Sequence, residues 1–129
     1  MIDSRAIIAV ALGAAIGGVC RYLVAALFAQ RFGGGFPYGT LFINVTGSFF
    51  IGAITELSLT RALGVTPMVR AFAATGVLGG YTTFSTFSLE SFNLLDQSWY
   101  LTALYVGASV TFGMLGAGFG SLCARIAIR

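Results

Sequence analysis

The sequence predicts an all-α integral membrane protein with four transmembrane helices in one domain over residues 1–129. Its composition is 57% hydrophobic and only 9% charged, whereas soluble domains are about half apolar and about a quarter charged. A soluble chain of this length leaves much of its surface in water, and this one has too few polar side chains to cover that surface. The surplus apolar surface must therefore face the lipid bilayer.

Four apolar segments reach the roughly 20 residues that a bilayer-spanning helix needs. They cover residues 4–30, 38–60, 68–96 and 99–124, and Ser4 is the expected N-cap of the first. The stretches RFGGGFP at 31–37 and RALGVTP at 61–67 separate the first three segments, since glycine and proline mark turns. An even number of spans places both termini on one side of the membrane.

The net charge of +3 comes from seven arginines and four acids, with no histidine. The arginines are spread singly, which argues against nucleic-acid binding. By the positive-inside tendency their distribution favours cytoplasmic termini. Arg21 and Arg31 are assigned to the side of the membrane away from the termini. The arginines on the same side as the termini are Arg5, Arg61, Arg70, Arg125 and Arg129.

Small residues recur at four-residue spacing in three of the predicted helices. The pairs are Gly13 with Gly17, Gly76 with Gly80, and Gly116 with Gly120. This spacing lets helix backbones approach closely in a membrane, where lipid gives no hydrophobic drive for association. We expect close helix packing at all three pairs.

The third segment contains a polar stretch, GGYTTFSTFSLE, at residues 79–90. Gly79 and Gly80 each weaken a helix by about 1 kcal/mol relative to alanine, and two β-branched threonines follow. We expect a break near Gly79 to Thr83 that is buried in protein or lines a polar cavity, since freed backbone groups cannot face lipid. Freed carbonyls would suit a cation, and the N–H groups that begin the next half-helix would suit an anion.

The hydroxyls of this stretch have two interpretations. Serine and threonine in membrane helices commonly bond the carbonyl four residues earlier. Five hydroxyls so close to a glycine pair instead favour contact of some of them with freed backbone groups or a solute. They belong to Thr82, Thr83, Ser85, Thr86 and Ser88.

Aromatic and amide groups near the break point to an anion. Phe84 and Phe87 lie at i and i+3 on one helical face, and their positive ring edges suit a small anion, although packing is the alternative role. Asn44 places an amide in the second segment, where it must be paired. Its NH2 group has two donors, which either bind an anion or bond a neighbouring helix.

Arg21, Glu90 and Glu56 are three of the charged residues within the predicted spans. We expect Arg21 to face the protein interior or an aqueous vestibule, or to extend its head group to the membrane interface. Glu90 either lines the same path or caps a helix end. Glu56 is nearer a membrane boundary, where we expect a solvated carboxylate.

Two stretches resemble the Fluc, or CrcB, family of microbial fluoride channels: GTLFINVTGSFFIG at 39–52 and TGVLGGYTTFSTFSLE at 75–90. The resemblance covers essentially the whole chain, and the GGxTTFSTFS string together with a G-T-L-x-x-N helix is highly specific. It implies passive, selective movement of fluoride across the cell inner membrane, which relieves fluoride accumulation in the cytoplasm.

The resemblance also implies a dimer of two subunits inserted in opposite orientations, with two fluoride pores at their interface. Phe84 and Phe87 would be the pore phenylalanines, and Asn44 a pore-lining amide. Gly79 and Thr82 would give backbone carbonyls from both subunits to a central structural sodium ion. The other candidate positions along the pathway are Arg21, Thr40, Thr83, Glu90, Tyr105 and Ser109.

Two features depart from the family pattern. The family carries a polar track on its fourth helix, which here runs Tyr105, Ser109, Gly113, Ala117, so the last two members lack hydroxyls. The arginine bias between the two sides is also larger than a protein inserting both ways would ideally show. We favour a homodimer, and a heterodimer with an oppositely oriented paralogue is the alternative.

Other functions explain fewer features of the sequence. A proton-coupled exporter of the small multidrug type needs a titratable acid near the middle of the first helix, where this chain has Arg21. A non-transporting assembly subunit would explain the glycine pairs but not the clustered polar groups. An enzyme is not indicated, because the chain has no histidine and no convincing pair of acids for catalysis.

Overall fold

The computed structural model describes residues 3–60 and 64–129, and every helix or strand assigned in those ranges is a helix. Three helices are long and apolar enough to cross a membrane: α1 (Ser4–Phe32), α2 (Tyr38–Leu59) and α6 (Trp99–Ala127). The remaining segment consists of α3 (Pro67–Arg70), the π-helix η2 (Ala71–Leu78), α4 (Gly79–Tyr81) and α5 (Phe84–Gln97).

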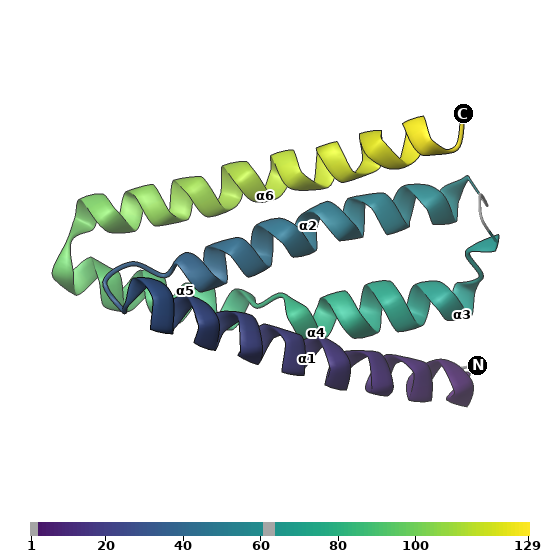
Figure 1. Ribbon diagram of the computed structural model, residues 1–129, viewed down its shortest axis with the longest axis horizontal. Helices are drawn as coiled ribbons and strands as arrows, with labels where there is room; N and C mark the ends of the chain where they lie inside the picture. Colours follow the sequence, from purple (N-terminus) through teal and green to yellow (C-terminus); the bar gives the residue numbers. More distant parts are fainter. Residues whose placement is uncertain (1–2, 61–63) are drawn as a thin grey trace.

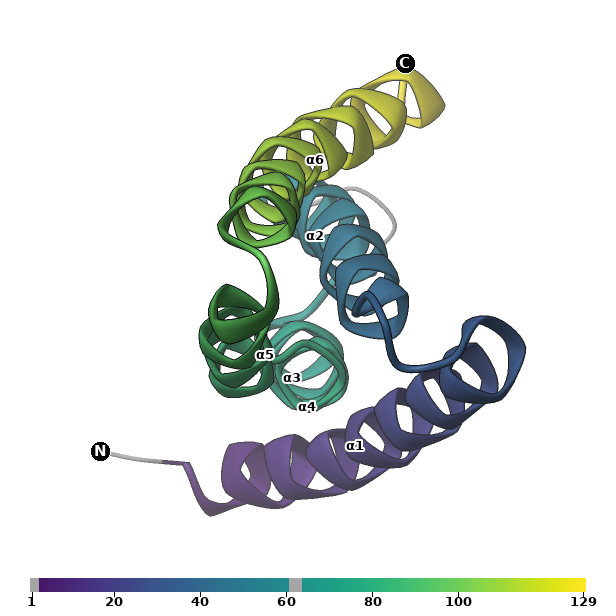
Figure 2. The ribbon, with the colours of Figure 1, turned by 90° about the vertical axis from the view of Figure 1, so that its left-hand side faces the viewer.

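The helices form a bundle elongated along one axis (Figure 1). Helices α2 and α6 lie side by side, and α1 packs against η2 and α4. Seen from one end, α1 crosses beneath the interrupted segment while α6 lies on the far side of α2 (Figure 2). Both termini lie at one end of the bundle, called here the terminal end, and the loop at 33–37 and the α5–α6 turn lie at the other.

The first helix differs from its predicted bounds at both ends. Asp3 is its N-cap, because the Asp3 side chain accepts a hydrogen bond from the N–H of Arg5 at 2.9 Å, so the prediction of Ser4 as N-cap is wrong. The helix also continues two residues past residue 30, to Phe32. It ends where Gly33 adopts a φ of 72°, a conformation that glycine adopts without steric cost.

The other ends lie within three residues of the prediction. The sequence places Pro67 in a loop, but Pro67 begins α3, because the first helical position needs no N–H donor. Helix α2 ends at Leu59 instead of residue 60, α5 ends at Gln97 instead of residue 96, and α6 extends past residue 124 to Ala127. Residues 61–63 of the predicted second loop lie outside the described residues.

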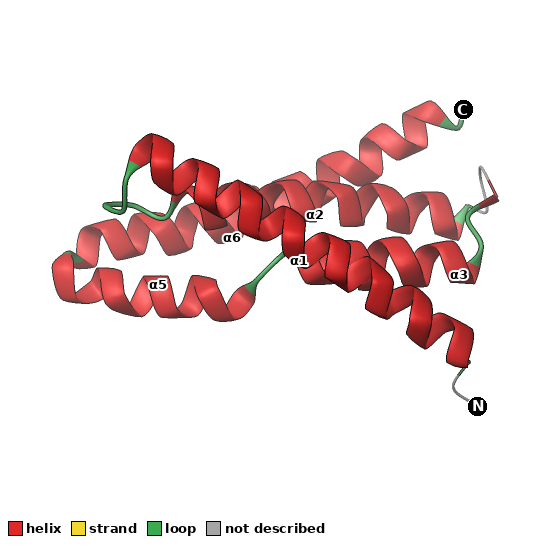
Figure 3. Cartoon of the chain, turned by 60° about the horizontal axis from the view of Figure 1, so that its bottom comes forward, coloured by secondary structure: helices red, strands yellow, loops and turns green. Residues whose placement is uncertain are grey.

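The third predicted helix is interrupted, as its sequence predicts. The backbone is extended at Thr82 (φ −76°, ψ 162°) and Thr83 (φ −153°, ψ 119°), and the link before α5 is visible as a loop (Figure 3). Gly79 and Gly80 stay helical, so the glycines precede the break and do not form it. The turns before them are wide, because η2 is a π-helix, a form often found at functional sites.

The glycine pairs of α1 and the interrupted segment bring two backbones into contact. A Cβ on Gly76 would lie 3.0 Å from the Cα of Gly13, and one on Gly17 would overlap the carbonyl of Val77. A Cβ on Gly80 would lie 2.5 Å from the carbonyl oxygen of Ala14. The predicted close packing at these two pairs is confirmed, and it fixes the position of the segment that carries the break.

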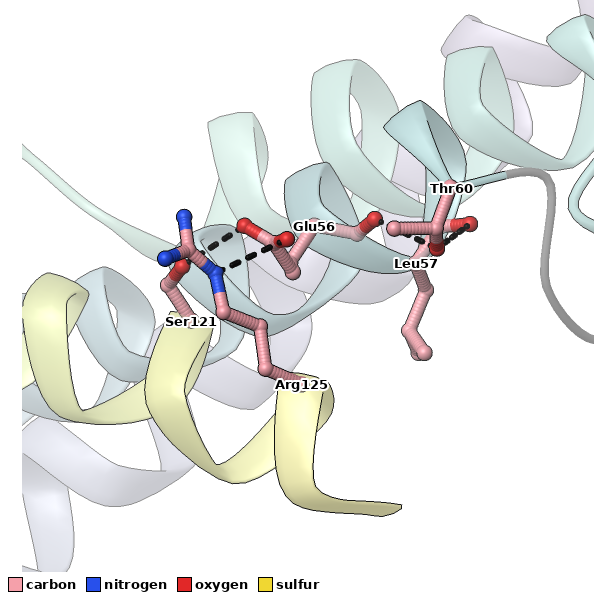
Figure 4. A network of polar contacts seen from close by, with 5 residues as sticks. All are labelled: Glu56, Leu57, Thr60, Ser121 and Arg125. Atoms are coloured by element: carbon pink, nitrogen blue, oxygen red, sulfur yellow. Dashed lines mark hydrogen bonds and ion pairs between the residues drawn. The ribbon is translucent and has the colours of Figure 1, made fainter. Parts of the chain in front are cut away.

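Helices α2 and α6 are also joined by an ion pair near the terminal end (Figure 4). The Nε atom of Arg125 lies 2.9 Å from Oε1 of Glu56, and the Ser121 hydroxyl donates to Oε2 of Glu56 at 2.8 Å. The Glu56 side chain is only 13% exposed. The expectation of a solvated Glu56 is therefore wrong, because two side chains of α6 take the place of water.

Close packing of α2 and α6 predicts opposite effects for two neighbouring glycines of α6. A Cβ on Gly120 would overlap the carbonyl of Phe49, whereas one on Gly118 meets nothing within 4 Å. We expect Gly120→Ala to lower the free energy of unfolding by about 1–3 kcal/mol through overpacking. Gly118→Ala should leave it unchanged or raise it by up to about 1 kcal/mol, through helix propensity. Unfolding titrations in detergent micelles measure both, and equal effects would contradict the contact.

Candidate functional site

The break is held by a pair of hydrogen bonds from Asn44 of α2. The Asn44 Nδ2 atom donates to the carbonyl of Thr83 at 3.0 Å, and the N–H of Thr83 donates to Asn44 Oδ1 at 2.9 Å. In a continuous helix that N–H would bond the carbonyl of Gly79. Thr83 is only 7% exposed, so the Asn44 amide makes the hydrogen bonds that water cannot make there. The helix-to-helix role of Asn44 is thus observed, and one Nδ2 hydrogen remains for a further acceptor.

The Thr83 hydroxyl caps the half-helix that follows the break. It accepts from the N–H of Thr86 at 3.2 Å and donates to the Thr86 hydroxyl at 3.0 Å. Thr82 and Ser88 instead bond back four residues, to the carbonyls of Leu78 and Phe84 at 3.0 and 2.9 Å. These hydroxyls are therefore engaged locally, and the local interpretation accounts for most of the cluster.

Arg21 of α1 reaches the same break from the other side. Its Nη1 atom donates to the carbonyl of Thr82 at 3.1 Å, which is the interior placement that the sequence predicts as one option. The Gly79 carbonyl loses its helical partner because the Thr83 N–H turns to Asn44. An open hollow of about 340 Å³ is lined by Gly79, Thr82 and Thr83 together with α2 residues. Gly79 and Thr82, whose carbonyls the sequence assigns to a cation, thus line one hollow.

A second contact across the break escapes sequence analysis. The hydroxyls of Thr46 in α2 and Tyr81 in α4 lie 3.1 Å apart. Thr46 also bonds back to the carbonyl of Phe42 at 2.7 Å, so by sequence it is an ordinary membrane threonine. No spacing pattern marks this pair, which holds α4 against α2 just before the break.

Three aromatic rings form a row that begins at the break. The ring centroids of Phe84 and Phe87 are 5.8 Å apart, and those of Phe87 and Tyr105 are 5.3 Å apart, with tilted planes. The two predicted phenylalanines therefore do lie together. Phe84 is 78% exposed in the single chain, while Tyr105 is fully buried. The row thus leads from an exposed surface into the space between α5 and α6.

A carboxylate lies at the inner end of this row. Glu90 of α5 accepts from the Thr40 hydroxyl at 2.9 Å and from the Tyr105 hydroxyl at 2.8 Å. Thr40 is 5% exposed and Glu90 is half-buried, so three helices meet at an acid with two neutral donors. The structure brings together three residues that the sequence assigns to one pathway.

Ser109 lies one helical turn beyond Tyr105 in α6. Its hydroxyl is buried, and no group in the described residues bonds it. A buried hydroxyl without a partner costs free energy, unless a water molecule or an ion completes it. Among the predicted pathway residues, Ser109 is therefore the one whose hydroxyl is free for a solute.

The two small residues of the α6 track lie next to α2. A Cβ on Gly113 would lie 3.6 Å from the Ser48 hydroxyl, and the backbone of Ala117 lies where a Cβ on Gly52 would fall. The departure from the family pattern at these positions therefore accompanies close contact between α2 and α6.

The chain matches the model of the family described as CrcB-like protein, Camphor Resistance (CrcB), over residues 8–121. This chain belongs to the CrcB family. With its three long apolar helices, it is a multi-pass membrane protein.

Curated relatives align along most of their length. A protein of Rhizobium meliloti (strain 1021) is 49% identical over 115 residues, which is 88% of this chain and 91% of the relative. One of Roseiflexus sp. (strain RS-1) is 46% identical over 93% of this chain and 97% of the relative. One of Trichormus variabilis is 43% identical over 92% of this chain and 88% of the relative. All three are named fluoride-specific ion channel FluC.

The bonds between Asn44 and Thr83 predict the result of replacing the amide. Asn44→Leu leaves the Thr83 N–H and carbonyl without partners, so the free energy of unfolding should fall by about 2–4 kcal/mol. Hydrogen exchange at the Thr83 amide should also become faster. Ser48→Ala, one turn away in α2, is the control and should change neither quantity. Unchanged exchange at Thr83 in the Asn44 variant would contradict the role of the amide.

Proposed function

We propose that this protein is a fluoride-selective ion channel that lets fluoride leave the cell passively across the inner membrane. The proposal rests on the names of relatives that align over nearly the whole chain. The row of rings from Phe84 to Tyr105, together with the free hydroxyl of Ser109 one turn further along α6, supports it within this chain. A channel of this kind moves an ion and transforms no substrate, so the protein is not an enzyme.

The interrupted segment, which is third in chain order, would join α1, α2 and α6 as a further membrane span, giving a single transmembrane domain of four spans. It runs from α3 through α5, and the freed backbone groups of Thr82 and Thr83 are bonded by Arg21 and Asn44 and not left to lipid. Satisfied backbone is the condition under which a non-helical link is tolerated at membrane depth. Both termini at one end of the bundle agree with an even number of spans.

Fluoride is small and strongly hydrated, so a selective pore must replace its water with close donors. Ring edges of Phe84 and Phe87, the remaining Nδ2 hydrogen of Asn44 and the Ser109 hydroxyl would supply such partial positive charge. None of them carries a full charge that would trap the ion, and conduction needs binding weak enough for release. Thr83 would position these groups by fixing the break.

The cluster of Thr40, Glu90 and Tyr105 would lie at the inner end of the pathway. In the single chain both hydroxyls donate hydrogen bonds to Glu90, so a passing anion must compete with this carboxylate for these hydrogen bonds. Arg21 would offset negative charge near the break, because its guanidinium is fixed on the Thr82 carbonyl. Opposite charges on either side of the rings would thus act on an ion between them.

The channel would be an antiparallel dimer with two pores, and a homodimer is the simpler assembly. Two features of the single chain support a partner at the break. Phe84 is 78% exposed beside polar groups. A Cβ on Gly79 would find only its own segment, at 3.9 Å, so nothing within the described chain explains why this exposed helical position is glycine. A heterodimer with an oppositely oriented paralogue would cover the same surface.

The carbonyls of Gly79 and Thr82 would hold a structural sodium ion at this interface. Neutral carbonyl oxygens are ligands that suit a hard cation, and both line the hollow next to the break. The Thr82 carbonyl already accepts from Arg21 and keeps a second lone pair for a metal. One chain gives too few oxygens for a sodium site, so the ion would need the same pair from a second copy.

The channel function predicts flux from liposomes loaded with fluoride. Purified protein should release fluoride, measured with a fluoride electrode, and should barely pass chloride. Phe84→Ile and Asn44→Asp should each slow the release by at least about ten-fold, which corresponds to about 1.4 kcal/mol of ion stabilisation. Phe50→Ile, on an exposed part of α2, is the control and should conduct normally. Equal release rates for fluoride and chloride would contradict the proposed selectivity. Normal fluoride release in both the Phe84 and the Asn44 variant would contradict the assignment of these residues to the pore.

The interface predicts a dependence of the dimer on sodium. Replacing sodium chloride by potassium chloride should lower the dimer fraction in dilute detergent, measured by light scattering after size-exclusion chromatography. Gly79→Val should dissociate the dimer without unfolding the subunit, because the chain itself leaves space there. Gly118→Ala is the control for an open glycine elsewhere. A Gly79→Val protein that stays dimeric, equally in both salts, would place the interface and the ion elsewhere.

A further inference from the structure

An apolar groove, called here the α1–α2–α6 groove, lies between the last turns of α1, the first turns of α2 and the middle of α6. Its volume is about 520 Å³, and among its nine lining residues only Tyr38 has a polar side-chain group. Figure 2 shows the last turns of α1 and the interrupted segment on different sides of α2. The groove shares no lining residue with the hollow beside the break. It is therefore separate from the surface proposed for a partner subunit and sodium.

The groove exists because two backbones touch between large side chains. Gly116 of α6 lies at its floor, where a Cβ would be 3.0 Å from the carbonyl oxygen of Val45 in α2. Phe112 and Phe119 lie about one turn before and after this glycine, and both are exposed. The close contact of α2 with α6 therefore leaves a recess between the two phenylalanines.

The groove is closed at depth and open toward the end of the bundle that carries the loop at 33–37, called here the loop end. On the wall opposite α6, the rings of Phe28 in α1 and Phe42 in α2 stack with centroids 5.0 Å apart. At the deep end the rings of Phe49 and Phe119 lie 5.9 Å apart, so α2 and α6 meet there. Tyr38, the first residue of α2, lies at the open end.

The aromatic residues of the loop end place it at the membrane surface. Tyr38, Trp99 and Tyr100 are exposed there, and tyrosine and tryptophan are enriched at the level of the lipid head groups. The groove follows α2 from Tyr38 to Val45, which is about 10 Å at about 1.5 Å per residue. It therefore runs from the head-group level through about a third of a hydrocarbon core that is about 30 Å thick.

A cation lies beside the open end of the groove. Arg31 is in the last turn of α1, three residues after Phe28, so the two share one side of the helix. Arg31 is exposed, and within residues 3–60 and 64–129 no acidic side chain forms an ion pair with it. A basic residue at the membrane surface attracts anionic lipids. The mouth of the groove is thus suited to an anionic head group.

We propose that the α1–α2–α6 groove binds one acyl chain of an anionic phospholipid, with the head group at Arg31 and the Tyr38 hydroxyl. An unfilled recess at membrane depth loses van der Waals contacts, and a flexible alkyl chain from the same leaflet restores them. The charge at the mouth and the apolar interior match the two parts of a phospholipid, so a lipid and not a second copy of the chain is the occupant. The site lies outside the proposed pore and does not depend on fluoride conduction.

Competition between two lipids tests the head-group site. Native mass spectrometry of the protein from micelles with equal amounts of phosphatidylglycerol and phosphatidylcholine gives the ratio of the two lipids retained. Arg31→Gln should lower this ratio by about five-fold, which corresponds to the roughly 1 kcal/mol that one basic residue contributes at a membrane surface. Arg5→Gln removes a charge at the opposite end of α1 and is the control, so it should leave the ratio unchanged.

Filling the groove tests the acyl-chain site without changing any charge. Leu115 is exposed and lines the groove, so Leu115→Trp places a larger side chain there without repacking the core. We expect this variant to retain at least about five-fold less of the bound phosphatidylglycerol. Leu122→Trp is the matched control, because Leu122 is exposed two turns further along the same side of α6 and does not line the groove. It should retain lipid as the unmodified protein does.

Equal lipid ratios in Arg31→Gln and Arg5→Gln would overturn the head-group site, and normal retention in Leu115→Trp would overturn the acyl-chain site. A smaller assembly in Leu115→Trp with its lipid intact would assign the groove to a second copy instead. Loss of the proposed channel function has a different sign, because a protein that releases no fluoride from liposomes should still retain the lipid. The two failures are therefore distinguishable.

Discussion

The pair of hydrogen bonds between the Asn44 amide and the Thr83 backbone is the contact on which the rest of this structure depends. A helix interrupted inside a membrane protein frees N–H and carbonyl groups that neither lipid nor water can satisfy. A single amide meets both needs of Thr83, as donor and as acceptor. The Thr83 hydroxyl can then cap the following half-helix, and Phe84 and Phe87 take their positions from that cap.

The polar interior is built from groups that largely satisfy one another. Arg21 donates to a carbonyl, and Glu90 accepts hydrogen bonds from two hydroxyls, so both charges have polar partners within the bundle. One exception lies in α6. The Ser109 hydroxyl is buried without a described partner. This hydroxyl therefore keeps its capacity for hydrogen bonds within the described part of the chain.

Packing and function make different demands on the glycines of this chain. Most glycines at helix contacts are explained within one subunit, because a Cβ would strike the backbone of a neighbouring helix, as at Gly17 and Gly120. Gly79 has no such neighbour, although it is next to the break and to the polar hollow. The single chain is therefore well packed where α1 meets η2 and α2 meets α6, and open where the proposed partner and ions would lie.

The sequence by itself determined the membrane class, the three long spans, the position of the interruption to within a few residues and the glycine contacts. These follow from composition and short-range spacing, which act along one helix. Helix ends at Asp3 and Pro67 were less predictable, because capping and first-turn positions depend on single backbone groups.

Only the tertiary structure decided which polar groups meet. Asn44 and Thr83 are 39 residues apart, Arg21 and Thr82 are 61 apart, and Glu56 and Ser121 are 65 apart. No periodicity within a helix relates residues at such separations, because their contact depends on how α1, α2, α5 and α6 are rotated and shifted against one another. The backbone contacts of the glycines set that rotation, so the polar site is a consequence of the packing around it.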